Sequence, residues 1–210
     1  MTSRCLLASL VLVVATAWGG TARADDHQIN SGPTIDAYFL AEAFGSYRVR
    51  SDGERVREDD IDLDTTLGGG LRLEHGFGML AYGFSAEFRG YGNSDYDERD
   101  FAIDLNPVLG VRVPLIGRNG RGLILRGTLT GGYTLMLPNE TYFGQDRFHG
   151  FNVGALAGLG YSFGRVGFFA DLGVRHHRVF GSADFGVLGN AKGSIAWTQF
   201  SFNSGFRIAI

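Results

Sequence analysis

The sequence has almost none of the residues that cross-link a chain or bind transition metals, and it is nearly without lysine. Its only cysteine is Cys5 and its only lysine is Lys192. A single cysteine cannot form an internal disulfide, and no Cys–His zinc spacing occurs. We also find no phosphate-binding glycine loop and no Ser–His–Asp order. The sequence therefore predicts no cofactor, no metal site and no catalytic residue.

The first 24 residues predict a cleaved secretory signal peptide. Arg4 supplies a positive charge, an apolar stretch runs from Cys5 to Trp18, and Ala22-Arg23-Ala24 matches an A-x-A cleavage site. A membrane anchor is the alternative, but the apolar stretch is short of the ~20 residues that span a bilayer. Cleavage would leave 186 residues and no cysteine. We expect a periplasmic tail at 25–33 and a barrel domain at 34–210.

The charge balance of the predicted mature chain is mildly acidic. Without Arg4 and Arg23, 17 basic residues face 22 acidic residues, which gives a net charge of −5. Proteins that bind nucleic acids usually carry a basic patch. We therefore expect no nucleic-acid partner.

Nothing after the leader has a helical period, and no later apolar run is long enough to cross a membrane as a helix. Apolar residues instead occupy alternate positions, which is typical of strands. Eight such segments occur, at about 35–47, 63–73, 80–88, 101–113, 123–135, 153–163, 166–174 and 197–210. Short links (EHGFG, PLIGRNGRG, GR) alternate with longer polar links. This organisation predicts an all-β, eight-stranded antiparallel up-and-down barrel.

The stretch VGALAGLGYSFGRVGFFADLGVR, residues 153–175, shows the pattern most clearly. Gly164-Arg165 suits a type II′ turn, because glycine tolerates the positive φ of the first central position. That turn predicts that Tyr161 pairs with Phe168 on one face and that Gly158 pairs with Asp171 on the other. Larger residues then oppose glycines, as a narrow barrel interior requires.

Glycine and charge on the polar face distinguish a membrane barrel from a soluble exported barrel, which is the alternative. Nothing crowds a solvent-facing surface, so glycines there would only cost stability, whereas an eight-stranded lumen has little room for side chains. All seven bases on this face are arginine, whose guanidinium fork matches carboxylates. We predict an internal salt-bridge network that plugs the barrel. Its members are Asp36, Glu42, Asp64, Glu74, Glu87, Asp104, Asp171, Arg48, Arg72, Arg89, Arg112, Arg126, Arg175 and Arg207.

The apolar face would then contact lipid. Tyrosine and phenylalanine near the strand ends would form the interfacial belts of such barrels. They are Tyr47, Tyr82, Tyr133, Tyr161 and Phe180. The last residues have glycine followed by apolar side chains at alternate positions, namely Gly205, Phe206, Ile208 and Ile210.

This combination resembles the small eight-stranded outer-membrane barrels of Gram-negative bacteria, typified by the transmembrane domain of outer-membrane protein A. The resemblance is architectural and covers the predicted mature chain. It implies short periplasmic turns, longer external loops and a C-terminal insertion signal formed by the last-named four residues, with Ile210 in place of the usual terminal aromatic. It also implies an outer-membrane location and a structural or surface-interaction role without catalysis.

The partners implied by this resemblance are outer-membrane lipid and lipopolysaccharide, with the barrel-assembly machinery and periplasmic chaperones during biogenesis. We expect the protein to act as a monomer. A narrow pore for ions or small solutes is the alternative function, although paired charges would fill the lumen.

Two further chemistries find weaker support. A lipid A deacylase resemblance would need a His-x-Ser motif, but Arg178 and Val179 stand two positions after His176 and His177. The alternation places His176 on the outer face and His177 inward or in the loop. Asn93, Asp95 and Asp97 have the alternate spacing of calcium ligands, but the turn glycine and later bidentate acid of a calcium loop are not convincing.

Overall fold

The computed structural model describes residues 32–51, 54–57, 65–93, 96–118, 121–137, 147–184 and 190–210. The predicted signal peptide and most of the predicted tail lie outside these residues. Within them the secondary structure is β-strand, joined by tight turns. No described helix is long and apolar enough to span a membrane.

Eight long strands form one closed antiparallel sheet, and a ninth, short strand extends it. The eight wall strands are β1 (Gly32–Ser51), β3 (Thr66–Phe77), β4 (Leu80–Asn93), β5 (Tyr96–Arg118), β6 (Arg121–Leu137), β7 (Phe148–Phe163), β8 (Val166–Asp184) and β9 (Asn190–Ala209). Each pairs with its neighbour in sequence, and β1 also pairs with β9, which closes the ring. The predicted eight-stranded antiparallel barrel is confirmed.

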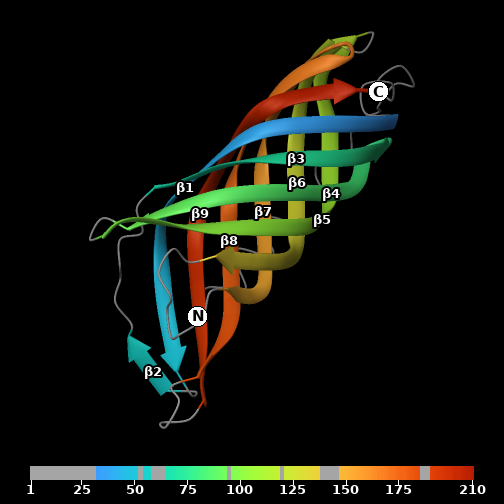
Figure 1. The fold of residues 1–210 in the computed structure, drawn as a ribbon. Helices are drawn as coiled ribbons and strands as arrows, with labels where there is room; N and C mark the ends of the chain where they lie inside the picture. Colours follow the sequence, from blue (N-terminus) through green and yellow to red (C-terminus); the bar gives the residue numbers. More distant parts are fainter. Residues whose placement is uncertain are drawn as a thin grey trace, which may run out of the picture.

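The barrel has two different ends. Tight turns at Gly78-Met79 and Gly164-Arg165 lie at the end where β1 begins and β9 finishes, which we call the short-turn end. At this end Ile210 N donates to Pro33 O at 3.0 Å and Ala209 N donates to Arg165 O at 2.7 Å. The opposite, loop end carries the short strand β2 (Glu54–Arg57), which pairs only with β1. In Figure 1 the short-turn end is at the upper right and β2 at the lower left.

The hairpin of β7 and β8 has the predicted register. Tyr161 pairs with Phe168 and Gly158 with Asp171. Gly164 has a φ of 100°, in the region that the first position of a type II′ turn requires. The spacing of glycines and large residues along one hairpin therefore specified which side chains oppose each other.

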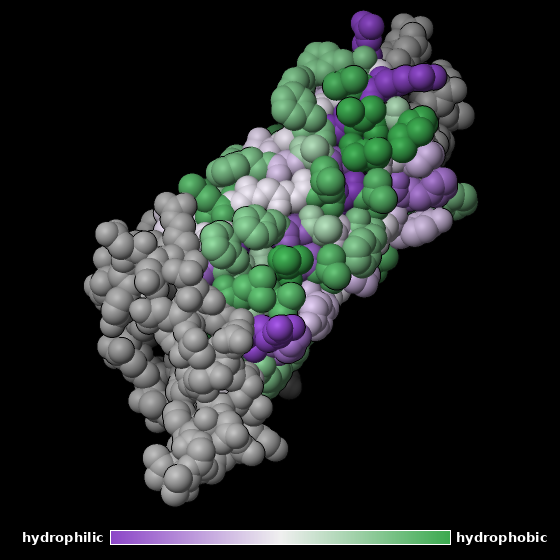
Figure 2. Space-filling model, in the orientation of Figure 1, coloured by the Kyte–Doolittle hydropathy of each residue, from purple (hydrophilic) through white to green (hydrophobic). Residues whose placement is uncertain are grey.

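The outer wall is apolar. Large exposed hydrophobic side chains lie along all eight wall strands, and Leu109 and Leu129, a cross-strand pair, are 63% and 56% exposed. Apolar side chains cover much of the wall in Figure 2. Of the predicted belt residues, Tyr82, Tyr133, Tyr161 and Phe180 are exposed on this wall. The side chain of Tyr47 is not among those described.

Two links differ from the prediction. The PLIGRNGRG segment was predicted to be one of the short links, but most of it is strand: β5 continues to Arg118 and β6 begins at Arg121, with a register shift between Pro114 and Ile116. The first of the longer polar links was predicted without a strand, but it contains β2. In both cases the strands continue their backbone pairing into segments whose amino-acid composition suggested loops.

The ladder between β5 and β6 is interrupted near the middle of β5. The register passes from Leu105–Tyr133 to Val108–Thr130, without partners for the intervening residues. Pro107 has no N–H to donate, which accounts for a gap in the ladder at this point. The other edge of β5 stays paired, since Pro107 lies opposite Phe84 of β4.

Candidate functional site

The barrel interior is filled by charged side chains that are almost completely removed from solvent. Six carboxylates and six guanidinium groups meet there, and only Arg207 has a side chain more than a few per cent exposed, at 14%. Alternation in the strands sends these side chains inward, because their neighbours in sequence carry the apolar wall. The twelve residues are Asp36, Glu42, Glu74, Glu87, Asp104, Asp171, Arg72, Arg89, Arg112, Arg126, Arg175 and Arg207.

Nearest the short-turn end, Asp36 on β1 is the centre of a first cluster. Arg207 Nε and Nη2 donate to its two oxygens at 2.7 and 2.9 Å, the bidentate geometry that makes such pairs strong. Arg126 Nη2 lies 3.1 Å from Asp36 Oδ2, while Arg126 Nε lies 3.1 Å from Asp171 Oδ1. One arginine thus joins β1 to β8 across the lumen.

Glu74 on β3 is the second acceptor in this cluster. Arg112 Nη2 donates to Glu74 Oε1 at 2.5 Å, and Arg207 Nη2 donates to the other oxygen. Arg112 Nη1 also donates to the backbone oxygen of Gly127 at 2.7 Å. Arg72 Nη1 stands farther away, at 3.6 Å from Glu74 and 3.9 Å from Asp36. The cluster therefore holds four guanidinium groups and three carboxylates.

Nearer the loop end, Glu87 on β4 is the centre of a second cluster. Arg175 donates to both of its oxygens, at 2.5 and 2.9 Å, and Arg89 Nη2 donates at 2.5 Å. Glu42 lies 3.3 Å from Arg89 Nε and 3.5 Å from Arg175 Nε. Both arginines of this cluster are thereby placed between two carboxylates.

Asp104 on β5 completes the second cluster. It accepts from Arg89 Nη1 and, at 2.6 Å, from the hydroxyl of Thr134. His177 Nε2 lies 3.0 Å from Asp104 Oδ2, the oxygen that also accepts from Arg89. The His177 ring also stacks on Trp197, with ring centres 4.8 Å apart and planes 9° apart. Through His177, Asp104 thus connects the charged side chains to the aromatic residues nearer the loop end.

Tyr38 links the two clusters. Its hydroxyl donates to Glu87 Oε1 at 2.5 Å, and the guanidinium of Arg72 lies over its ring at 5.0 Å. The ring fits only because glycines oppose it. A Cβ on Gly70 would lie 2.6 Å from Tyr38 Cζ, and one on Gly205 would lie 2.6 Å from Tyr38 Cβ. This close approach explains two glycines inside strands, where glycine otherwise weakens pairing.

Apolar side chains close the lumen at the loop end. Tyr91 and Trp197 meet edge to face, with centres 5.5 Å apart and planes 85° apart. Seven buried residues form this cluster, which we call the apolar cap. They are Tyr91, Ala102, Met136, Phe148, Val179, Ile195 and Trp197.

Not every predicted network residue belongs to the interior. Asp64 lies outside the described residues. Arg48 was predicted to point inward, but it is exposed and pairs with Ala196 on the outer face. The reason is a register shift between Ala43 and Gly45, where β1 gains one residue relative to β9. Such a bulge moves every later side chain to the other face of the strand.

Several interior residues were not predicted, among them Tyr38 and Trp197. Both occupy inward positions of the same strands as the charged residues, so strand alternation was the signal available. The prediction used charge and glycine to identify the polar face, which overlooked aromatic residues on it. His176 faces outward, as the alternation indicated, and His177 faces inward.

The four predicted insertion-signal residues lie at the short-turn end of β9. Phe206, Ile208 and Ile210 are 54%, 51% and 73% exposed on the outer wall. Gly205 faces inward against Tyr38. The structure thus presents the three apolar side chains as one stripe.

Among the residues described, no group of three His, Cys, Asp or Glu side chains is arranged to hold a metal ion. Each carboxylate is opposed by at least one arginine or histidine. Burying such charges is tolerated only when they are paired and hydrogen-bonded, and breaking one pair costs about 3–5 kcal/mol.

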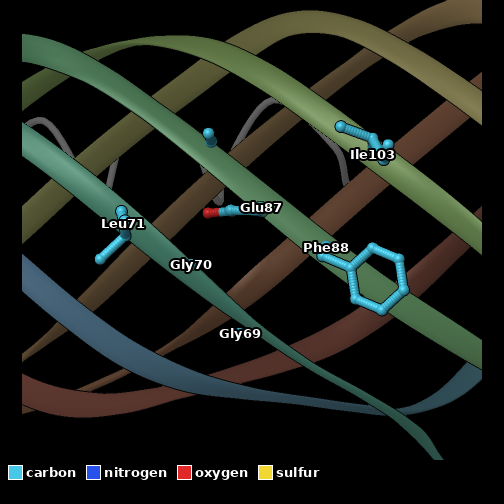
Figure 3. Close-up of a pocket in the computed structure, with 7 residues that line it drawn as sticks. Gly69, Gly70, Leu71, Glu87, Phe88 and Ile103 are labelled. Carbon is cyan, nitrogen blue, oxygen red and sulfur yellow. The ribbon is translucent and has the colours of Figure 1, made fainter.

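A shallow hollow lies on the outer wall, away from the lumen. The residues that line it are Gly69, Gly70, Leu71, Ala86, Glu87, Phe88 and Ile103. Figure 3 shows Leu71 and Phe88 beside the two glycines, with Glu87 leaving β4 in a different direction from Phe88. This hollow is part of the apolar wall.

These features define a closed eight-stranded antiparallel barrel with an apolar exterior and a charged, filled interior, the fold of small outer-membrane barrels. No protein-family model matches the sequence, and no curated protein matches it. Solved structures do match. The outer membrane protein OprG from Pseudomonas aeruginosa aligns over 86% of this chain and 97% of its own, with 14% identity and a TM-score of 0.55.

Two other solved structures align at lower similarity. Neisserial surface protein A (NspA) covers 83% of this chain and 97% of its own, with 13% identity and a TM-score of 0.41. Ail, the attachment invasion locus protein of Yersinia pestis, solved with the heparin analogue sucrose octasulfate, covers 85% of this chain and 99% of its own, with 16% identity and a TM-score of 0.38. At 14% identity, the alignment with OprG shows a shared fold.

Proposed function

We propose that this chain is a non-catalytic, non-conducting protein of the bacterial outer membrane, which presents its loop end at the cell surface. The short-turn end would face the periplasm, as expected for a barrel that enters the membrane from that side. The external loops would carry whatever surface interactions the protein makes. Lipopolysaccharide and membrane lipid would surround the wall.

The apolar wall supports the membrane placement. Leucine, valine, phenylalanine and isoleucine side chains that are 37–78% exposed would be costly in water over so large an area, whereas acyl chains would cover them. A closed barrel satisfies its backbone hydrogen bonds internally, which is the condition for strands to cross a bilayer. The wall strands have 12–23 residues, and crossing takes about 9–11.

The proposal that the barrel does not conduct ions rests on its filled interior. Paired guanidinium and carboxylate groups occupy the lumen between Arg207 and His177, and the apolar cap, which includes Trp197, fills it toward the loop end. Water and ions would have to displace pairs whose separation costs several kcal/mol. A permanently open path is therefore not expected.

Planar-bilayer recording tests this proposal. The refolded mature chain should insert and give no steady single-channel current. A variant with Arg72→Ser and Arg175→Ser removes two large interior side chains and leaves an excess of carboxylates, so it should give small, cation-selective currents. Stable wild-type openings would refute the plugged lumen and support the narrow pore.

The two histidines bear on the enzyme alternative. His177 is inside the barrel beside Asp104, while His176 Nδ1 lies 2.8 Å from the Thr198 hydroxyl on the outer wall. The rings occupy opposite faces of β8 and cannot share a substrate. Folded protein incubated with lipopolysaccharide should leave its acyl chains unchanged, and release of a fatty acid would contradict the non-catalytic assignment.

Biogenesis is part of the same proposal. Periplasmic chaperones would deliver the unfolded chain across the periplasm. The barrel-assembly machinery would then recognise the exposed stripe of Phe206, Ile208 and Ile210. The closed sheet leaves no long unpaired edge between wall strands, which is consistent with a monomer. Cells that express Phe206→Ser should assemble less folded protein in the outer membrane than cells that express the wild type.

A further inference from the structure

The guanidinium of Arg72 is completely buried, yet it makes no hydrogen bond to any residue that the structure describes. Its side chain is 0% exposed, and Nε, Nη1 and Nη2 all lack an acceptor. The carboxylate oxygens of its two ion pairs, on Glu74 and Asp36, lie 3.6 and 3.9 Å from Nη1, which is beyond hydrogen-bond length. Buried polar groups are almost always hydrogen-bonded, so this side chain calls for a partner.

The carboxylates of the first cluster already accept hydrogen bonds from the other three arginines of that cluster. Each of the six carboxylate oxygens accepts from one of these three. The acceptors are Asp36, Glu74 and Asp171, and the donors are Arg112, Arg126 and Arg207. Four guanidinium groups against three carboxylates leave one positive charge in excess, and Arg72 is the cation without an acceptor.

Tyr38 lies between Arg72 and the second cluster. The Arg72 guanidinium stands over the Tyr38 ring at 5.0 Å, and the Tyr38 hydroxyl donates to Glu87 at 2.5 Å. The two oxygens of Glu87 also accept from Arg89 and Arg175. A cation over an aromatic ring is stabilised electrostatically, but its N–H groups gain no acceptor from that contact.

Two neighbouring strands place further unsatisfied polar side chains beside Arg72. Ser85 of β4 is the cross-strand partner of Arg72, and Asn106 of β5 is the partner of Ser85. Residues paired in this way have Cβ atoms about 4.5–5.5 Å apart on the same face of the sheet. Ser85 and Asn106 are both 0% exposed, and Ser85 Oγ, Asn106 Nδ2 and Asn106 Oδ1 have no hydrogen-bond partner among the described residues.

Donors outnumber acceptors in this patch of the inner wall. The guanidinium N–H groups of Arg72, the Asn106 NH₂ group and the Ser85 hydroxyl all donate, whereas the Asn106 carbonyl and the Ser85 oxygen are its acceptors. A water molecule donates as many hydrogen bonds as it accepts, so it would leave N–H groups unsatisfied. An anion accepts only, and it also neutralises the excess positive charge.

We propose that Arg72, Ser85 and Asn106 form a buried binding site for a small inorganic anion, with chloride as its occupant. Arg72 supplies the charge, and Ser85 and Asn106 supply neutral donors. Because all three side chains are fully buried, the ion is enclosed when the barrel closes, and a large organic anion does not fit. The site requires the folded barrel but neither the outer-membrane location nor the absence of conduction, so its test is independent of both.

Urea unfolding of the folded full chain in dodecylmaltoside micelles tests the site, with sodium chloride replaced stepwise by sodium gluconate at constant ionic strength. An anion that binds only the folded state lowers the unfolding equilibrium constant about tenfold for each tenfold rise in chloride above its dissociation constant. Arg72→Met should abolish this dependence. Ser85→Asp should abolish it as well and should be more stable than the wild type in gluconate, because the new carboxylate lies opposite Arg72.

Ser201→Ala is the matched control. Ser201 is 1% exposed on the inner wall and donates to Asn203, so its loss removes a buried hydroxyl outside the proposed site and should leave the chloride dependence unchanged. Equal stability of the wild type in chloride and gluconate, or an unchanged dependence in Ser85→Asp, would overturn the proposal.

Crystals grown in sodium bromide locate the ion directly. Bromide scatters anomalously, so we expect an anomalous peak beside Arg72 and Ser85 in the wild type and none there in Ser85→Asp. An ordered water molecule in this position, without anomalous signal, would show that the patch binds solvent and would refute the anion site.

Discussion

Replacing Glu87 with glutamine should weaken the barrel more than any single change on its surface. Glu87 accepts hydrogen bonds from Tyr38, Arg89 and Arg175, and its charge opposes both arginines. Glutamine keeps the shape but presents an NH₂ group to guanidinium donors. Breaking a buried pair costs about 3–5 kcal/mol, and because Glu42 still faces both arginines we expect about 3 kcal/mol.

Urea unfolding from phosphatidylcholine vesicles measures this loss. Trp197 is the only tryptophan beyond the predicted leader and is buried in the apolar cap, so its fluorescence reports on the interior. Tyr38→Phe is the matched control, since it removes one of the same hydrogen bonds and no charge, at about 1 kcal/mol. Glu87→Gln combined with Arg175→Met should be less unstable than the two single losses added together. A Glu87→Gln variant within 1 kcal/mol of the wild type would refute the stabilisation by Glu87, and strict additivity would show that Glu87 and Arg175 do not couple.

Three more changes probe the packing, the cap and the wall. Gly158→Phe should prevent folding into vesicles, because a Cβ there would lie 2.0 Å from Ala170 O; normal assembly of this variant, judged by protease resistance, would disprove the close approach. Trp197→Ala should cost about 3–5 kcal/mol by removing the ring stacked on His177, measured by urea titration with circular dichroism, and a loss below 1 kcal/mol would mean that the cap is not packed. Leu109→Arg should cost about 2–4 kcal/mol in bilayers if its exposed side chain meets the hydrocarbon core, and an unchanged stability would place that face in water.

Strand alternation was sufficient to predict most of the fold. The two faces of each strand differ so strongly, with leucine or phenylalanine outside and glycine or charge inside, that inward and outward positions could be assigned without coordinates. The tight turn at Gly164 then set the pairing of β7 with β8, which the structure reproduces residue by residue. Twelve of the fourteen predicted network residues lie in the interior as a consequence.

The orientation of Arg48 could not be predicted from strand alternation. One extra residue near Gly45 reverses the alternation for the rest of β1, and nothing in the local sequence distinguishes a bulge from an ordinary strand. The partners of each charge were also beyond prediction. Arg126 reaches Asp36, which is 90 positions away, and such contacts across the lumen depend on how far neighbouring strands are staggered.

The apolar cap could not be predicted for a different reason. Near the loop end both faces of the strands carry large apolar side chains, so the contrast between the faces disappears. Trp197 and Phe148 lie on inward positions by alternation alone, but a polar interior was assumed along the full length of the barrel. Only the coordinates show that the charges end and aromatic residues begin at His177.

The bidentate pair of Asp36 with Arg207 has a consequence for the order of assembly. These residues are 171 positions apart, on the first and last wall strands, so their contact waits until the C-terminal strand has been synthesised and delivered. A shortened chain that ends before β9 would leave Asp36 without this partner and the sheet open along two edges. The ring can therefore close only when the last strand is present, because the pairing of β1 with β9 needs both ends of the chain.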